Sequence, residues 1–414
     1  MGHAHRVDDS PMCSGNLDKR PGIVSAGDAP GAIVIGSDYI ALGVVRSLGR
    51  QGIPVWVLRD SMHAEAAVSR YTRRCLPWPA EQAARLALLL KLSIEFGLRN
   101  WALFPTDDEA AALVARNHQI LAEHFVLTTP PWETLQWAYD KRQTHALAVR
   151  LAIGQPRTQF PRDEAAAAAL ECTFPVILKP AVKNLTNAFT LARAWRVDDR
   201  RQLLERYAEA AKHVPRDVIM VQELIPGGSE TRCSFAALCV DGRPLAWLTA
   251  QRSRQFPIEF SRGSTFVETV NEPAVEQLAR RLLAEIRYSG LVEVEFKRDP
   301  RTGEYKLLDI NARTWGWHTL GRRAGIDFPF LSWQLAHGMP IAAVYARPGV
   351  RWVRALTDLR AVLAETWRGQ LSISAYLRSI RPPFECAIFA FDDLLPALSD
   401  LPSVIRRSWS RAKK

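Results

Sequence analysis

The sequence has no apolar run that approaches the length of about 18 residues needed for a membrane-spanning helix. Its six cysteines, at positions 13, 75, 172, 233, 239 and 386, show neither the spacing of metal ligands nor that of a redox pair. No secretory signal precedes the first predicted strand. These absences argue against a membrane-spanning protein, a cysteine-based metal protein and a secreted protein, and we expect a cytoplasmic one.

The chain carries a net charge of +11, but its basic residues are dispersed and accompany no nucleic-acid recognition motif. We therefore predict no nucleic-acid partner. Residues 340–414 hold 12 Lys and Arg against 6 Asp and Glu. The basic end, Arg406–Lys414, is suited to weak contact with an anionic membrane surface, but Pro396 and Pro402 interrupt any long helix, and a frayed, solvated tail is the favoured interpretation.

The 414 residues allow two or three domains. Residues 1–30 are polar and rich in Gly, Pro and Asp, so we expect a disordered segment. Residues 31–58 then alternate as strand, helix and strand, which is typical of an α/β unit. Their glycines lack the G-x-G-x-x-G spacing of dinucleotide-binding folds, so we predict no NAD or FAD. Thr106, followed three residues later by Glu109, is predicted to cap a helix.

Residues 290–313 predict a β-hairpin with one apolar face and one polar face. Both strands alternate with a period of two. The polar face carries Glu293, Glu295, Asp309, Asn311 and Arg313, where a core strand would carry apolar residues. A solvated acidic face is favoured for Glu293 taken alone, but not for the other acids taken together.

The expected register of this hairpin opposes its acids. A turn centred near Thr302 would place Glu295 opposite Asp309 and Glu293 opposite Asn311. Directly opposed carboxylates repel each other, so a positive group should lie between them. Mg²⁺ fits best, because it prefers oxygen ligands and commonly uses one or two carboxylates together with substrate phosphates.

The run Val294-Glu-Phe, a short turn and Leu307-Leu-Asp-Ile-Asn-Ala-Arg resemble the metal-binding end of the ATP-grasp superfamily, whose members use Mg·ATP to activate a carboxylate. The resemblance implies that Glu295, Asp309 and Asn311 bind Mg²⁺ or Mn²⁺. It also implies that Arg313 faces the transferred phosphate or the acyl phosphate. The resemblance covers residues 32–338.

Upstream segments match the nucleotide contacts of this superfamily in the same order. The apolar run Phe174–Pro180 contains Lys179, and a lone cation at the end of a buried strand suits a phosphate better than a snorkelling surface position. The resemblance implies that Lys179 contacts the α- and β-phosphates and that Lys141 is the first nucleotide lysine. It also implies Gln222, Glu223, Leu224 and Ile225 at the adenine hinge and Glu230 at the ribose hydroxyls.

One stretch departs from the superfamily, which usually closes a glycine-rich loop over the phosphates and uses its backbone N–H groups as an anion nest. Residues 181–189 contain no glycine. Asn184 or Asn187 is the residue best able to adopt a left-handed turn there, because Asn tolerates that region better than most residues. Lys183 would supply positive charge in place of the backbone amides.

Two further features flank the hairpin. Arg252 and Arg254 fall on one face of a predicted strand, and guanidinium groups bind anions in bidentate fashion. We predict that the pair cradles an anion and assign Arg254, with Arg313, to catalysis; an exposed basic edge strand is the alternative. His318 follows the hairpin, and a packed histidine is favoured over an acid or base of the reaction.

These features predict an α/β and α+β fold in which a small N-terminal α/β domain precedes a two-lobed ATP-grasp fold. The predicted divisions are a disordered segment at residues 1–30, the small domain at 31–135, the ATP-grasp domain at 136–338 and a basic C-terminal extension at 339–414.

Residues 41–49 and 311–318 look most like the carboxylate–amine ligase branch of the superfamily. The resemblance implies that ATP phosphorylates a small-molecule carboxylate, that an amine captures the acyl phosphate, and that ADP and phosphate are released. Two alternatives stay open: a small-molecule kinase on the same fold and a nucleotide-binding regulator without turnover. The sequence leaves the two substrates and the oligomeric state open.

Overall fold

A computed structural model describes residues 30–60, 64–182, 187–192, 194–258, 260 and 263–400. The segment predicted to be disordered lies outside this description except for Pro30, and so does the basic end Arg406–Lys414. Within the described part of the chain, no helix combines the length and the apolar character needed to cross a bilayer.

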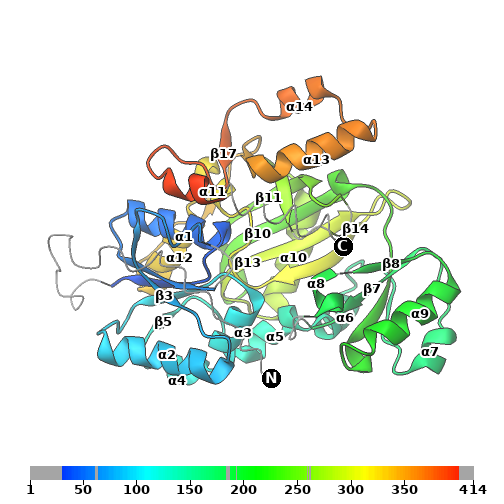
Figure 1. Ribbon diagram of the computed structural model, residues 1–414, viewed down its shortest axis with the longest axis horizontal. Helices are drawn as coiled ribbons and strands as arrows, with labels where there is room; N and C mark the ends of the chain where they lie inside the picture. The colour runs from blue at the N-terminus through cyan, green and yellow to red at the C-terminus, as the bar shows by residue number, and fades with distance from the viewer. Residues whose placement is uncertain are drawn as a thin grey trace, which may run out of the picture.

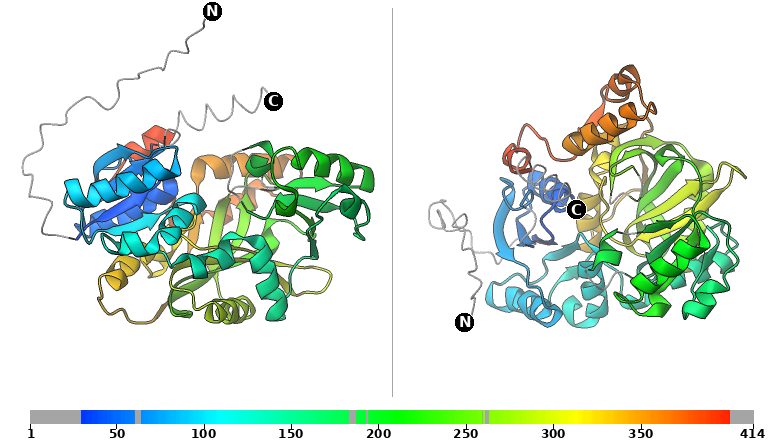
Figure 2. Two further views of the ribbon diagram at one scale, coloured as in Figure 1. Left: turned by 90° about the horizontal axis from the view of Figure 1, so that it is seen from below. Right: turned by 45° about the vertical axis from the view of Figure 1, so that its right-hand side comes forward.

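The N-terminal unit is a five-stranded parallel sheet with strand order β3-β2-β1-β4-β5 (Figures 1 and 2). Its elements are β1 (Ala32–Ile35), α1 (Tyr39–Arg50), β2 (Val55–Arg59), β3 (Thr72–Pro77), α2 (Gln82–Glu95), β4 (Ala102–Pro105), α3 (Asp108–Arg116), α4 (His118–Ala122) and β5 (Val126–Leu127). Helix α1 covers one face, and α2 and α3 cover the other. The central strands are apolar throughout because both of their faces are buried. The predicted strand–helix–strand start is confirmed.

The predicted cap of α3 is wrong by one residue. Asp107, not Thr106, is the N-cap, and its carboxylate accepts from the N–H of Ala110 over 2.8 Å. Thr106 instead donates to the carbonyl of Ile35. Glu109 forms an ion pair with Arg85 and does not complete a capping box. Asp outcompetes Thr here because it ranks higher as an N-cap and stands next to it.

A second, four-stranded antiparallel sheet has the order β6-β9-β7-β8. The elements of this lobe and of the segment leading into it are α5 (Trp132–Tyr139), α6 (Lys141–Arg150), β6 (Thr158–Gln159), α7 (Glu164–Ala168), β7 (Val176–Pro180), α8 (Ala188–Ala192), β8 (Trp195–Val197), α9 (Arg200–Ala210) and β9 (Ile219–Glu223). Helices α7 and α9 pack together and share the core of this lobe with β7 and β9. The lobe lies at the opposite end of the molecule from the N-terminal unit (Figure 2).

The third sheet has eight strands and lies between these two units. Its path is β14-β13-β10-β11-β12-β16-β17, and β15 pairs with β11. Its strands are β10 (Arg232–Val240), β11 (Arg243–Gln255), β12 (Ser264–Val270), β13 (Gly290–Arg298), β14 (Tyr305–Asn311), β15 (Val344–Tyr345), β16 (Arg351–Val353) and β17 (Phe384–Cys386). Its helices are α10 (Pro273–Glu285), α11 (Thr319–Ala324), α12 (Phe328–Ala336), α13 (Ala355–Trp367) and α14 (Ile373–Ser379).

The boundary predicted at residue 338 does not coincide with the end of this sheet. Strands β15, β16 and β17 all follow that residue and pair within it. The predicted fold class, a small α/β unit followed by two mixed lobes, is confirmed. The domain boundaries themselves stay predictions.

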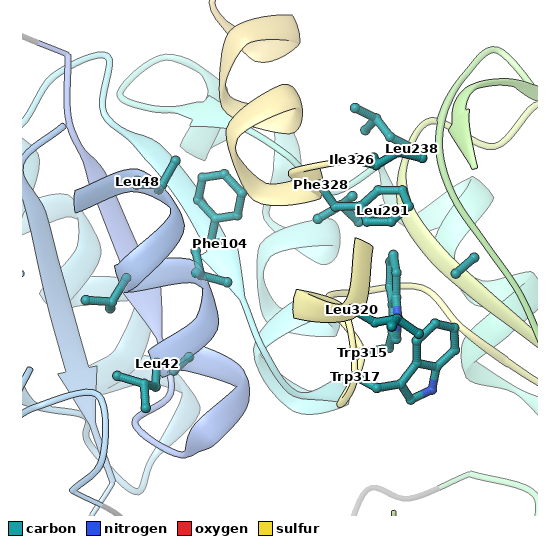
Figure 3. Close-up of a cluster of buried hydrophobic side chains, with 14 of the residues drawn as sticks. Leu42, Leu48, Phe104, Leu238, Leu291, Trp315, Trp317, Leu320, Ile326 and Phe328 are labelled. Carbon is teal, nitrogen blue, oxygen red and sulfur yellow. The ribbon is translucent and has the colours of Figure 1, made fainter. Parts of the chain in front are cut away.

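A continuous apolar core joins the N-terminal unit to the large sheet (Figure 3). Leu42 of α1 and Phe104 of β4 contribute from one side, and Trp315, Leu320 and Phe328 from the segment after the hairpin. Each of these side chains is at most 1% exposed. Such complete burial fixes the N-terminal unit against the end of the hairpin, because interiors pack at crystal-like density.

Candidate active site

The hairpin β13–β14 has the predicted register. Glu295 lies directly opposite Asp309, and Glu293 lies opposite Asn311. The side-chain amide of Asn311 donates to Glu293 over 3.1 Å and to Glu295 over 2.8 Å. The polar face therefore brings three carboxylates and one amide side by side.

Two cations from outside the hairpin neutralise these acids. Arg252, on β11, contacts Glu295 and lies 3.4 Å from Glu293. Lys141, the first residue of α6, contacts Asp309. The Arg252 and Lys141 side chains are 9% and 13% exposed, so the pairs lie where opposite charges attract more strongly than in water. Positive charge does lie between the opposed acids, although here it comes from side chains.

Glu295 and Glu293 occupy different electrostatic environments. Burial raises the pKa of each carboxyl and is the largest single effect at Glu295, but there the charges of Arg252 and Arg232 and the hydrogen bond from Asn311 together outweigh it, and the pKa falls below its ordinary value. At Glu293, burial and the nearby charge of Glu295 raise the pKa to about 7. Glu295 is therefore the ionised member of the pair, as a metal ligand must be.

Glu293 is buried and accepts several hydrogen bonds, so the prediction that it lies on a solvated face is wrong. It is 3% exposed. Its carboxylate accepts from Ser234 over 2.9 Å and from the indole of Trp317 over 3.0 Å, in addition to Asn311 and Arg252. Ser234 and Arg252 lie on other strands, so the alternation within the hairpin could not indicate that Glu293 is buried.

A cavity of about 150 Å³ lies where the four-stranded sheet and the large sheet face each other. Eight predicted residues line it: Lys141, Lys179, Gln222, Glu223, Leu224, Ile225, Glu295 and Asp309. Arg232, Arg252 and Lys297 line it as well. The lining thus holds five Lys and Arg against three Asp and Glu, and this excess of positive charge favours an anionic ligand. No motif singled out Arg232 or Lys297 in advance.

The side chains of the hinge after β9 bind protein groups. The amide of Gln222 donates to the hydroxyl of Thr158 over 2.8 Å. Glu223 forms ion pairs with Arg301 and Lys306, on the turn and second strand of the hairpin. Contact of either side chain with the exocyclic amine of adenine stays a prediction, and it would require these bonds to be exchanged.

Lys297 anchors the backbone of the same hinge. Its ammonium donates to the carbonyls of Ile225 and Gly227 over 2.8 and 2.7 Å. Burial and, to a smaller extent, the charge of Arg232 lower the pKa of Lys297 to about 8. The negative charge of Glu230 acts in the opposite direction and raises the pKa of Lys297, because its carboxylate lies near this ammonium. Glu230 itself does not line the cavity. Ribose binding by Glu230 stays a prediction.

Arg313 ends the hairpin and reaches the N-terminal unit. Its Nε donates to Asp108 over 2.8 Å. Its Nη2 lies 3.4 Å from the side-chain oxygen of Asn311. Arg313 therefore bridges the hairpin and Asp108, the first residue of α3.

Arg254 does not reach the cavity, in contrast to the prediction that it acts in catalysis. It is 5% exposed and forms a two-pronged ion pair with Asp358 of α13, over 3.0 and 2.8 Å. It also donates to Ser379 and lies over the ring of Phe266. The charge and the N–H groups of Arg254 thus hold the helices α13 and α14. Arg252, two residues earlier, lines the cavity instead.

The predicted phosphate lid is described only in part. Lys183 and Asn184 lie outside the described residues. Asn187 does not have a positive φ; it accepts from the N–H of Thr190 in the first turn of α8. It acts as a helix cap, a role that Asn also favours.

His318 is packed, as favoured. It is 1% exposed, and its Nδ1 donates to the carbonyl of Trp315 over 2.9 Å. A cavity of about 630 Å³ between α1, α11 and β17 reaches this ring. That cavity is larger than the one between the sheets, but it contains none of the residues predicted for catalysis, nucleotide or metal. We therefore locate the candidate site by its chemistry and not by cavity size.

The hairpin residues fit Mg²⁺ by donor type. Glu295 and Asp309 supply opposed carboxylates and Asn311 an amide oxygen, and Mg²⁺ commonly combines such ligands with substrate phosphates. Among the residues that the structure describes, no three or more His, Cys, Asp or Glu side chains form a preformed metal cluster. The three ligand assignments stay predictions.

Sequence comparison finds a matching family model and a similar protein. A family model described as "ATP-grasp in the biosynthetic pathway with Ter operon" matches residues 216–358, which include the hinge and the hairpin. A D-aspartate ligase of Enterococcus faecium (strain Aus0004) is 26% identical over 302 residues, which cover 68% of this chain and 70% of the relative.

Structure comparison gives the same fold. An L-amino acid ligase from Bacillus licheniformis has a TM-score of 0.58 at 17% identity, over 74% of each chain. The biotin carboxylase domain of the Hydrogenobacter thermophilus 2-oxoglutarate carboxylase, solved with MgADP, ADP and bicarbonate, has a TM-score of 0.61 at 17% identity, over 77% of this chain and 73% of that one. Identities this low establish the fold alone.

Proposed function

We propose that this chain, an ATP-grasp enzyme of the ligase type, joins the carboxylate of one small molecule to the amine of another and converts ATP to ADP and phosphate. One observation carries the proposal. The two lysines predicted to contact the phosphates, the predicted adenine hinge and the two opposed carboxylates come from distant parts of the sequence, and all of them line one cavity.

The reaction proceeds in two displacements. An oxygen of the substrate carboxylate attacks the γ-phosphorus, the bond to the ADP oxygen breaks, and an acyl phosphate forms. The amine then attacks the acyl carbon, phosphate leaves, and the nitrogen loses a proton. Such chemistry depends mainly on positioning and on charge neutralisation.

The residues that line the cavity supply both, together with Asn311, which donates to Glu295, and Arg313, which lies beside Asn311. Lys141 and Lys179 hold the phosphates, and Arg252 keeps Glu295 ionised beside them. Glu295, Asp309 and Asn311 would hold Mg²⁺, which, when bound, neutralises charge on the transferred phosphoryl group. Arg313 binds the carboxylate or the departing phosphate, because a guanidinium contacts such groups in bidentate fashion.

The decisive experiment uses hydroxylamine in place of the amine. Purified protein is incubated with Mg·ATP and a panel of amino acids and other small carboxylic acids. We expect ADP and phosphate in equal amounts and a hydroxamate of the activated acid. Lys179→Met is the control, because it removes a phosphate contact and should abolish both products.

The product pattern also separates the alternatives. A stable phosphorylated alcohol would assign the chain to the kinases. Stoichiometric AMP would contradict attack at the γ-phosphate. ATP binding without turnover across the panel would leave a nucleotide-binding regulator.

A further inference from the structure

Helix α13 carries an apolar stripe on its outer surface. Leu359, Leu363 and Trp367 follow one another at intervals of four residues, which places them on one side of the helix. Their exposed fractions are 49%, 63% and 90%. The other side of α13 is anchored, because Asp358, Ala361 and Val362 are buried. The stripe is therefore held outward by a fixed helix.

Helix α14 repeats this arrangement. Ile373 and Leu377, again four residues apart, are 66% and 57% exposed. Another side of α14 faces Arg254: the guanidinium lies over the ring of Tyr376 and donates to Ser379. Together the two helices present five large apolar side chains that no core in the described structure covers. Single exposed apolar residues are ordinary, but a group at helical spacing indicates a binding surface.

The exposed charged residues of the segment 355–381 are all basic. Arg368, Arg378 and Arg381 are exposed. In residues 355–381, all of which the structure describes, the two acids are Asp358, buried against Arg254, and the half-buried Glu365. An apolar surface with a basic rim matches a layer that is apolar inside and anionic at its surface.

The position of the helices agrees with such a layer. Figures 1 and 2 show α13 and α14 at one edge of the molecule, with α14 outermost. We propose that α13 and α14 dock on an anionic lipid bilayer surface, with the apolar stripe in the interface and the arginines at the headgroups. A two-fold dimer through the same surface is disfavoured, because it would set the basic rim of one copy against that of the other.

Cosedimentation of the full chain with lipid vesicles tests this surface. One set of vesicles contains equal parts of phosphatidylcholine and phosphatidylglycerol, and the other contains phosphatidylcholine alone. We expect binding to the first set and little to the second. Added salt should weaken it, because exposed charges are screened within about 10 Å at 0.1 M ionic strength.

The double variant Leu363→Ser/Trp367→Ser should bind the anionic vesicles at least about tenfold more weakly, because burial of each such side chain alone is worth a tenfold change or more. The matched control is Ile94→Ser on α2, which removes a side chain of similar exposure, 68%, from another unit and should bind as wild type does. Arg368→Gln and Arg378→Gln should each weaken binding about fivefold.

Three outcomes would overturn the proposal. Equal binding to both vesicle types would remove the role of lipid charge. Binding that survives the double substitution but disappears on deletion of residues 401–414 would assign it to the basic end. A dimer in light-scattering measurements that the double variant abolishes, with no vesicle binding, would show that a second copy covers the surface.

Discussion

Arg313 donates to Asp108 over 2.8 Å, across 205 positions of sequence. The pair connects the end of the hairpin β13–β14 to the first turn of α3, in a different sheet unit. Arg313 also lies beside Asn311, so it connects the proposed metal site with the N-terminal unit. The N-terminal unit thereby contributes an acid next to the residue expected to bind the reacting group.

Asp108→Asn should lower kcat/KM by about tenfold, because the amide no longer holds the Arg313 guanidinium by charge. Its effect on Tm should be small, since a partly exposed ion pair contributes at most about 1 kcal/mol. The measurement is steady-state ADP release beside a thermal unfolding scan. Glu109→Gln, on the same helix but paired with Arg85, is the control. An equal loss of activity there would point to the helix as a whole.

Glu295→Gln and Asp309→Asn should each abolish Mg²⁺-dependent turnover, because each replaces a carboxylate, a ligand type that Mg²⁺ prefers, by a neutral amide of the same shape. Unfolding in urea should remain cooperative, since neither change removes core volume. Glu304→Gln, an exposed acid in the turn of the same hairpin, should be fully active. Turnover near the wild-type level in either site variant would remove the metal assignment.

Asp358→Ala should destabilise the protein by about 3–5 kcal/mol, because it leaves the buried guanidinium of Arg254 without a counter-charge. Denaturant unfolding measures this loss. The double variant Arg254→Met/Asp358→Leu should recover most of the stability and retain ligase activity. If the double variant is stable but inactive, Arg254 does act in catalysis.

His318 should make stability depend on pH. Burial lowers the pKa of His318 to about 4, whereas the unfolded chain takes up this proton near pH 6.5, the ordinary value for histidine. Between these values the unfolded state binds more protons, so this contribution is complete above pH 6.5 and falls as the pH drops towards 4. At about pH 5 the loss amounts to about 2 kcal/mol.

His318→Gln, which keeps an N–H donor but does not titrate, should flatten that part of the pH profile. Unfolding free energies of both proteins at about pH 5 and pH 7.5 provide the measurement. An equal drop in both proteins would assign the pH dependence to other groups.

The sequence predicted the parts of the site that have local patterns. Alternation in residues 290–313 fixed the faces of the hairpin, and its turn residues fixed the register that sets Glu295 opposite Asp309. Lys179 could be predicted as a phosphate contact because it is a lone cation near the end of an apolar strand. In each case the polar residue and the apolar pattern that makes it stand out lie within one short segment.

The missed features depend on contacts between distant segments. Arg252 and Arg254 occupy the same strand face in the sequence, but only the structure shows that Asp358, more than a hundred positions later, binds one of them. The alternation in the hairpin gives no sign that Glu293 is buried, because its donors Ser234 and Trp317 lie on another strand and in the turn after the hairpin. Propensity and periodicity carry no information about partners at such separations.

Arg46 of α1 is 5% exposed, and its guanidinium donates to the carboxylate and carbonyl of Asp393 and to the carbonyl of Ile388. These partners leave the ribosome nearly 350 residues after Arg46 does. Until then the N-terminal helix holds a charge that its own unit cannot satisfy, at a cost of several kcal/mol if it is buried early. The N-terminal unit is therefore completed only after Asp393 has been synthesised, and a nascent chain stopped short of Asp393 should keep α1 open to chaperones and proteases.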